Sequence, residues 1–179
     1  PSRAIATLNV SRQMLSAGID CPSPILAARE YAGKATRDVF IADAVELPTL
    51  GSLLEAETDN QIRIAMLDIA ARHIAHLHDQ RFIHGDLLPN NLHTTPDLSR
   101  LYFLDNDRTR RWPVPPPGWR YRRNLAQMVY RLMRYSPEEV SRAFLRSYGQ
   151  ARHWSDARTQ RCSDRVMAAV RKRIARQPY

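Results

Sequence analysis

Apolar side chains recur at helical spacing most clearly over residues 60–79, and this periodicity predicts a helix there. Its apolar positions are Ile62, Met66, Ile69, Ile74 and Leu77. Thr58 and Gln61 fit a capping box, in which a hydroxyl and an amide satisfy free backbone groups of the first turn. We therefore expect an amphipathic helix that follows Thr58 and ends at Asp79.

Upstream of that helix, the pattern predicts another helix and two short strands. Residues 4–17 have helical spacing, and Gly18 is a typical helix stop. The apolar stripe expected on this helix holds Ile5, Leu8, Met14 and Leu15. The strands are expected at 25–31 and 38–45, separated by Ala32, Gly33 and Lys34.

Downstream, short apolar runs alternate with chain breakers. Four prolines make 112–118 a loop. Phe82 and Ile83 lead into a polar loop, and a β-hairpin is expected from residues 92–93 and 101–104. Helices are expected at 50–56, 122–134, 137–147 and 156–176. Because strands come early and helices dominate later, the expected fold class is α+β.

The polar loop carries the most informative spacing in the chain. Residues 84–91 read His-Gly-Asp-Leu-Leu-Pro-Asn-Asn, which places His84, Asp86 and Asn91 in an H-x-D-x-x-x-x-N pattern. Asp105 follows fourteen residues after Asn91, a gap that one hairpin fills. The hairpin is therefore expected to bring Asn91 and Asp105 side by side.

These residue types suit phosphoryl transfer, in which the protein mainly holds donor phosphate, metal and acceptor hydroxyl in line. A carboxylate beside the acceptor hydroxyl takes or orients its proton, and Asp86 is the candidate. Carboxylate and amide oxygens are hard ligands suited to Mg²⁺, and Asp105 and Asn91 supply them. The sequence thus predicts a kinase-type catalytic loop.

Here the chain resembles the protein-kinase-like superfamily, and within it the lipopolysaccharide kinase family that phosphorylates Kdo or heptose. Besides the catalytic loop, residues 16–24 (SAGIDCPSP) resemble that family's link after the N-lobe helix. Residues 103–108 (FLDNDR) resemble the segment where other kinases carry D-F-G, and 123–127 (RNLAQ) resembles a helix motif of the family.

The resemblance implies a protein-kinase-like fold with a partial N-lobe and hinge at 1–47 and a mostly helical C-lobe at 48–179. It implies ATP and Mg²⁺ as cofactors, Asp86 as catalytic residue, and Asn91 and Asp105 as metal ligands. Hinge residues Asp43, Ala44 and Val45 are expected to meet the adenine. His84 is expected to be a neutral, packed residue that buttresses the loop.

Two parts of a complete kinase of this type are missing from the sequence. No glycine precedes Gly18 and no glutamate precedes Glu30, so the glycine-rich loop and the usual lysine–glutamate pair are absent. Lys34 falls in the expected turn and is not placed like the phosphate-binding lysine. We therefore expect the chain to begin at the helix after the lysine strand, as a fragment, through a misassigned start of the reading frame, or as a natural truncation.

The net charge of the chain indicates an anionic partner. Lys and Arg total 27 against 18 Asp and Glu, for a net charge of +9, and 25 of the 27 are arginine. Six arginines between 108 and 123 bracket the proline loop, on the acceptor side in this superfamily. Guanidinium forks hold carboxylate and phosphate groups. The expected substrate contacts are Arg108, Arg110, Arg111 and Arg120.

The leading hypothesis is an ATP-dependent sugar kinase of the lipopolysaccharide inner core. We expect it in the bacterial cytoplasm, associated peripherally with the anionic inner face of the inner membrane, whereas nothing in the sequence matches a nucleic-acid-binding module. Two alternatives stay open. One is a small-molecule kinase of the aminoglycoside or choline kinase type, because His84-Gly85-Asp86 also fits that group. The other is a non-catalytic kinase-like binding protein, because the lysine and the glycine loop are missing.

Overall fold

The computed structural model describes residues 2–32 and 35–176, so Gly33 and Lys34 of the expected turn lie outside the described residues. The elements are α1 (Arg3–Ser16), β1 (Pro24–Ala32), β2 (Ala35–Ala42), α2 (Leu50–Ala56), α3 (Asn60–Asp79), β3 (Phe82–Ile83), η1 (Pro89–Asn91), β4 (Leu92–Thr94), β5 (Leu101–Phe103), η2 (Asn106–Arg108), β6 (Arg110–Arg111), α4 (Gly118–Leu132), α5 (Glu138–Ala151) and α6 (Asp156–Arg176). This order confirms the α+β class.

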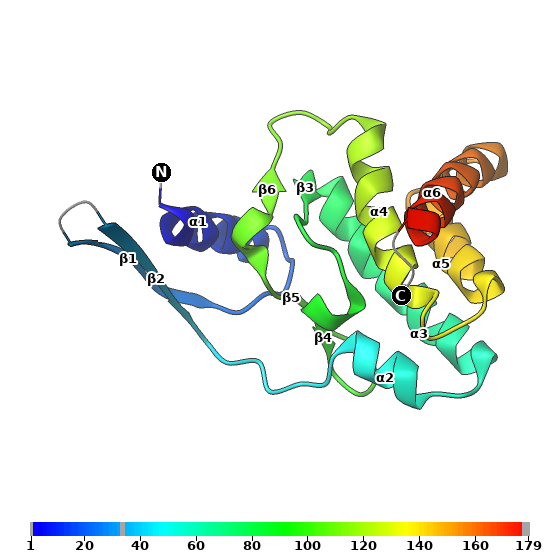
Figure 1. Cartoon of the computed structure of the whole chain (residues 1–179), viewed down its shortest axis with the longest axis horizontal. Helices are drawn as coiled ribbons and strands as arrows, with labels where there is room; N and C mark the ends of the chain where they lie inside the picture. The colour runs from blue at the N-terminus through cyan, green and yellow to red at the C-terminus, as the bar shows by residue number, and fades with distance from the viewer. Residues whose placement is uncertain (1, 33–34, 177–179) are drawn as a thin grey trace.

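The N-terminal part is a helix packed on a hairpin that projects from the rest of the chain (Figure 1). β1 and β2 are antiparallel, with Arg29 opposite Asp38. Asp38 also ties the hairpin to α1, because its carboxylate accepts hydrogen bonds from the backbone amides of Arg3 (2.7 Å) and Ala4 (3.4 Å). A carboxylate at the positive end of a helix is stabilising. The Arg29 guanidinium and these amides hold the pKa of Asp38 well below its usual range.

The buried face of α1 differs from the expected stripe. Ile5 and Leu15 are 45% and 37% exposed, whereas Met14 is fully buried. The buried positions are Ala4, Thr7, Val10, Ser11 and Met14. Small and hydroxyl-bearing side chains let α1 approach β1, β2 and η2 closely, so contact geometry and not hydrophobicity alone selects this face.

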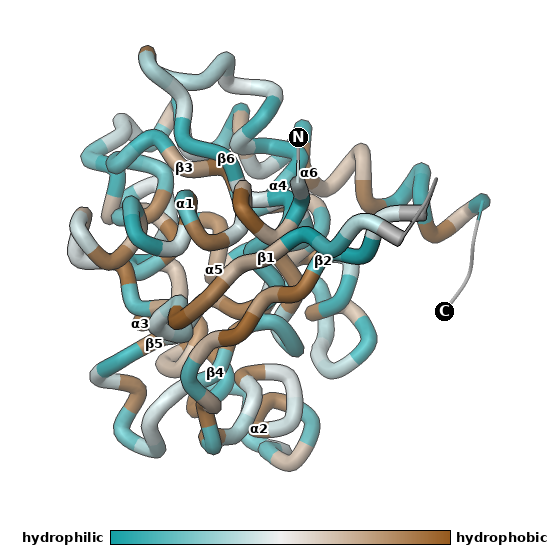
Figure 2. The backbone as a smooth tube through the Cα atoms, turned by 90° about the vertical axis from the view of Figure 1, so that its left-hand side faces the viewer, coloured by the Kyte–Doolittle hydropathy of each residue, from teal (hydrophilic) through white to brown (hydrophobic). Residues whose placement is uncertain are grey.

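Much of the hairpin's apolar surface is uncovered, and Figure 2 shows hydrophobic residues along both strands. Ile25 is 59% and Tyr31 is 74% exposed. Among the described strands, β1 and β2 pair only with each other. Sheet edges and apolar faces left open in this way favour association with further strands.

The core lies in the C-terminal part, where α3 packs on α5 and α4 packs on α6. Its buried residues include Leu67, Ile74, Leu77, Leu125, Val129, Phe144, Tyr148, Val166 and Val170. The bounds of α2, α3 and α6 match the expected ranges, whereas α4 begins at Gly118, four residues earlier than expected. No helix in the described part of the chain is both long and apolar enough to cross a bilayer.

The predicted capping box of α3 was wrong. Asp59 is the N-cap, and its carboxylate accepts a hydrogen bond from the Gln61 amide at 2.7 Å. The Glu57 carboxylate accepts hydrogen bonds from the backbone amides of Thr58 and Asp59, both at 2.7 Å. Carboxylates are stronger acceptors than a hydroxyl at a helix start, so they displace the Thr58 side chain from this role.

Candidate active site

The loop of residues 84–91 connects β3 to β4 and packs closely against η2. A Cβ atom at Gly85 would lie 2.0 Å from the Cβ of Arg108, a distance that no side chain tolerates. Only glycine lets the two segments approach this closely. Gly85 therefore fixes the distance between the Asp86 loop and the segment that carries Asp105.

His84 is fully buried beneath this loop and holds it in place. Its Nδ1 accepts a hydrogen bond from the Asp86 amide (3.2 Å), so Nε2 carries the proton and donates it to the Leu104 carbonyl (2.9 Å). Burial lowers the pKa of His84 to about 4, which leaves the ring neutral at pH 7. The expectation of a neutral, buttressing histidine is confirmed.

Two amide side chains of α4 grip the same loop from the other side. Asn124 Oδ1 accepts a hydrogen bond from the His84 amide at 3.1 Å, and its Nδ2 donates to the His84 carbonyl. Gln127 Nε2 donates to the Gly85 carbonyl (3.3 Å) and to Asp86 Oδ1 (3.4 Å). Both residues lie in the 123–127 segment that resembles a helix motif of the family, but the sequence alone predicts no role for either. Gln127 thus contacts the Asp86 carboxylate directly, whereas Asn124 holds the loop through the His84 backbone.

The Asn124 amide continues into a buried network that reaches α5. His78 Nε2 donates to Asn124 Oδ1 (3.2 Å), and His78 Nδ1 accepts from the Tyr148 hydroxyl (2.8 Å). Arg152 donates in turn to the Tyr148 hydroxyl at 3.2 Å. Every polar group along this chain of contacts has a partner, which makes it a rigid support for the loop.

The hairpin of β4 and β5 brings the two expected metal ligands next to each other. Leu92 pairs with Phe103, and the Leu104 amide donates to the Asn91 carbonyl at 2.9 Å. Asn91 Nδ2 donates to the Asp86 carbonyl at 2.9 Å, which joins this expected metal ligand to the Asp86 loop. Asn91, Asp86 and Asp105 are thus held by one hairpin and one loop.

Asp105 stands in an unusual backbone and electrostatic setting. Its φ of 57° lies in the left-handed region, which a non-glycine residue adopts at some cost. Burial raises the pKa of its carboxyl group, and the charges of Asp107 and Asp86 raise it further. The described residues hold no group of three or more His, Cys, Asp and Glu arranged around a common metal position. The chemistry of these side chains nevertheless suits Mg²⁺, because a cation relieves the repulsion between Asp105 and the carboxylates of Asp107 and Asp86, and the Asn91 amide oxygen is a hard ligand of the kind Mg²⁺ prefers.

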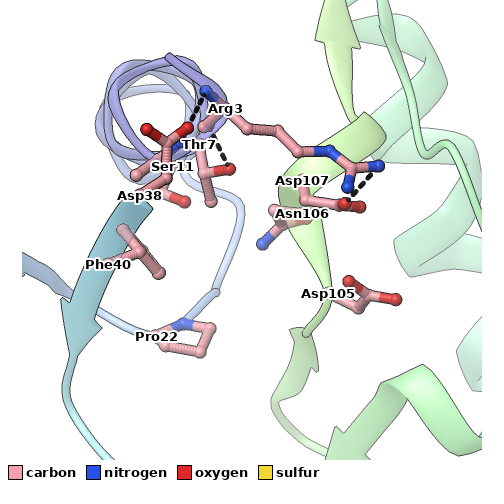
Figure 3. A pocket seen from close by; sticks show the side chains of 10 residues that line it. Arg3, Thr7, Ser11, Pro22, Asp38, Phe40, Asp105, Asn106 and Asp107 are labelled. Carbon is pink, nitrogen blue, oxygen red and sulfur yellow. Dashed lines mark hydrogen bonds and ion pairs between the residues drawn. The ribbon is translucent and has the colours of Figure 1, made fainter. Parts of the chain in front are cut away.

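A pocket of about 350 Å³ opens between α1, the hairpin β1–β2 and this acidic segment. Figure 3 shows Arg3 reaching across it from α1 toward Asp107, while Asp105 borders the same space. The Arg3 guanidinium and the Asp107 carboxylate are 3.0 Å apart. The N-terminal helix is therefore attached directly to the segment expected to bind the metal.

The expected hinge residues border a neighbouring pocket. Asp43, Ala44 and Val45 follow β2 and line a space of about 360 Å³, in which Pro22 is shared with the Asp105 pocket. The Asp43 amide donates to the Ser23 carbonyl at 3.0 Å, which anchors the start of this segment. The expected hinge residues and the acidic segment thus line two pockets that share Pro22.

The four expected substrate arginines line one groove of about 840 Å³, hereafter the acceptor-side groove. They are Arg108, Arg110, Arg111 and Arg120, and Gly85 and Asp107 line it as well. Arg120 is stacked between Trp112 (4.7 Å to the ring centroid) and Trp119 (4.2 Å). Its Nε is buried without a hydrogen-bond partner among the described residues. The cluster therefore adjoins the Asp86 loop and carries an unsatisfied donor.

Comparison with known proteins agrees with this geometry. A family model described as "Lipopolysaccharide kinase (Kdo/WaaP) family" matches residues 2–171. Among solved structures, the bifunctional kinase-methyltransferase WbdD superposes with a TM-score of 0.53 at 19% identity, covering 93% of this chain and 36% of that one. No curated protein matches. The WbdD likeness confirms the kinase-like fold, and because the family model covers almost all of its length, the chain belongs to the lipopolysaccharide kinase (Kdo/WaaP) family.

Proposed function

We propose that the protein transfers phosphate from ATP to a sugar hydroxyl, of Kdo or heptose, in the inner core of bacterial lipopolysaccharide. One observation carries this proposal beyond the family assignment. The groove beside the Asp86 loop is lined by His84 and Gly85 of that loop and by six arginines, so the expected catalytic residue directly follows a basic surface that suits an anionic acceptor. The six are Arg3, Arg108, Arg110, Arg111, Arg120 and Arg123. Inner-core sugars carry the carboxylates and phosphates that such a surface binds.

In this reaction Asp86 orients the acceptor hydroxyl and accepts its proton, while Gln127 and Asn124 hold the loop in the required position. Asn91 and Asp105 would hold Mg²⁺, which screens the charge of the transferred phosphate when it is bound. His84 takes no proton, because its ring nitrogens are engaged with the backbone. Residues 43–45 form the hinge that contacts adenine.

The proposal divides the chain into a partial N-lobe with hinge at 1–47 and a C-lobe at 48–179. It places the reaction at the cytoplasmic face of the inner membrane, where the acceptor is made, with peripheral attachment through the basic surface. The decisive experiment uses the protein expressed from its complete reading frame, purified lipopolysaccharide core and labelled ATP. Transfer of label to the core supports the proposal. Transfer only to an aminoglycoside or choline would favour the small-molecule alternative, and ATP binding without any transfer would contradict both.

Asp105→Asn is expected to weaken Mg²⁺-dependent nucleotide binding by about tenfold or more. The substitution keeps the size of the side chain but removes the charge that balances the metal. Calorimetric titration with ATP, with and without Mg²⁺, measures the effect on the complete protein. Asp97→Asn is the matched control, since Asp97 lies in the exposed β4–β5 turn. Equal Mg²⁺-dependent affinity in Asp105→Asn and wild type would remove Asp105 from the metal site.

Changing Arg110, Arg111 and Arg120 together to Gln is expected to weaken acceptor binding by at least about tenfold and to reduce its dependence on salt. Nucleotide binding should stay nearly intact, because these residues line the acceptor-side groove and not the Asp105 pocket. Binding of core fragments at low and high salt, beside an ATP titration, measures both quantities. Unchanged acceptor binding in the triple variant would make this groove an ordinary solvated surface.

A further inference from the structure

A second arginine-lined groove, hereafter the α4–α6 groove, runs between the two helices of its name. It has a volume of about 560 Å³ and is lined by Arg122 and Arg123 from α4, by Arg165 and Arg173 from α6, and by Trp119. None of the described residues that line it is a carboxylate. Four like charges on one concave surface repel one another, and a bound anion relieves that repulsion.

Two arginines near the groove are paired with a carboxylate, whereas the described residues pair none of the four groove arginines. Arg171 of α6 lies 2.7 Å from Glu138, and Arg142 of α5 lies 2.9 Å from the same carboxylate. By contrast, no ion pair joins any of the four groove arginines to a carboxylate within residues 2–32 and 35–176. In the described part of the chain, the carboxylates near α6 thus pair with arginines on its α5 side. The arginines on its α4 side have no such partner there.

The form of the groove suits a compact anion with an organic body. Val166 and Val170 are buried at its base, so charge above them acts through a partly apolar surrounding. The Arg173 guanidinium stacks 4.0 Å above the Tyr130 ring, which orients it while leaving its N–H edge for a ligand. Trp119 is 48% exposed although Arg120 stacks on its ring, so it adds aromatic surface beside the groove for an attached sugar or chain.

We propose that the α4–α6 groove is a second anion site of this protein and that its ligand is a phosphate ester. Arg123 and Gln127 line both this groove and the acceptor-side groove, so the two are contiguous across α4. An acceptor that already carries a phosphate group remote from the reacting hydroxyl can span them. This use of the site rests on the proposed function, whereas the binding itself does not.

The test compares Arg165→Gln/Arg173→Gln with Arg146→Gln/Arg161→Gln, which removes the same charge from exposed positions outside the groove. Two probes are used without ATP: glucose 1-phosphate by calorimetry, and phosphatidylglycerol vesicles by co-sedimentation. Wild type is expected to bind at least one probe, and the groove variant to bind it about tenfold or more weakly than the control variant. Loss with glucose 1-phosphate identifies a sugar phosphate as the ligand, and loss with vesicles alone identifies a lipid headgroup.

Three results would overturn the site: no binding of either probe by wild type, no difference between the groove variant and wild type, or equal losses in both variants, which would mark a general charge effect. Far-ultraviolet circular dichroism on all variants shows whether the helices are retained. Since no phosphoryl transfer is measured, failure of the kinase assay would leave this result unaffected.

Discussion

Asp86→Asn is expected to lower the rate of phosphoryl transfer by about 10²–10⁴-fold, the usual contribution of a positioned general base. Asparagine has nearly the same size and keeps an oxygen that can accept the Gln127 hydrogen bond, but it cannot take the proton of the acceptor hydroxyl. Nucleotide affinity should change little, because Asp86 does not border the Asp105 pocket or the hinge pocket. Single-turnover transfer to lipopolysaccharide core, beside an ATP titration on the complete protein, separates the two quantities.

Asp156→Asn is the matched control for this measurement. Asp156 is exposed in the first turn of α6 and lines neither the acceptor-side groove nor the Asp105 pocket, so the same change of charge there should leave transfer unaltered. An Asp86→Asn enzyme with wild-type turnover would exclude Asp86 as the base. A loss of equal size in the Asp156→Asn enzyme would instead point to a general effect of charge.

The elements predicted correctly from the sequence are those whose signals are local. α3 has a long apolar period, and the hairpin of β4 and β5 has two apolar runs around Thr95, Pro96 and Asp97. The start of α4 was missed because prolines and Gly118 normally mark a loop. Proline nevertheless has a backbone φ suited to a helix entrance, and Pro117 occupies the N-cap position.

The candidate site divides in the same way. The H-x-D-x-x-x-x-N spacing and the position of Asp105 lie within one short stretch, so sequence reasoning could group them. The residues that support this stretch are distant in the sequence. Asn124 bonds to His84 across forty positions, and Arg3, near the start of the chain, pairs with Asp107. Residues 123–127 resemble a helix motif of the family, but no local pattern indicates that Asn124 or Arg3 contacts the site. Only the packing of α1 and α4 assigns them to the site.

The buried histidines beneath the site predict a strong loss of stability in acid. Burial lowers the pKa of His78 to about 3 and that of His84 to about 4, against 6.5 for an exposed histidine. The unfolded chain therefore binds more protons than the folded one. The stability that these neutral rings provide is present above about pH 7 and falls below about pH 6.5 by about 1.4 kcal/mol per pH unit for each ring, down to about pH 4 for His84 and about pH 3 for His78. The free energy of unfolding should thus be about 4 kcal/mol smaller at pH 5 than at pH 7, a large part of the total for a domain.

Urea unfolding followed by circular dichroism at several pH values measures this slope. His78→Gln removes one of the two most strongly shifted rings, so its loss of stability between pH 7 and pH 5 should be about 2 kcal/mol smaller than that of wild type, even if the variant is less stable throughout. Burial also lowers the pKa of His73, which adds a further contribution common to both proteins. His153→Asn is the control, because His153 is exposed and its φ of 51° is one that asparagine accepts. A flat wild-type profile, or a full slope in His78→Gln, would mean that the network from Tyr148 to His84 accommodates a charged ring. The conclusion that His84 is neutral at pH 7 would then be wrong. The conclusion that this residue only positions the Asp86 loop would fail with it.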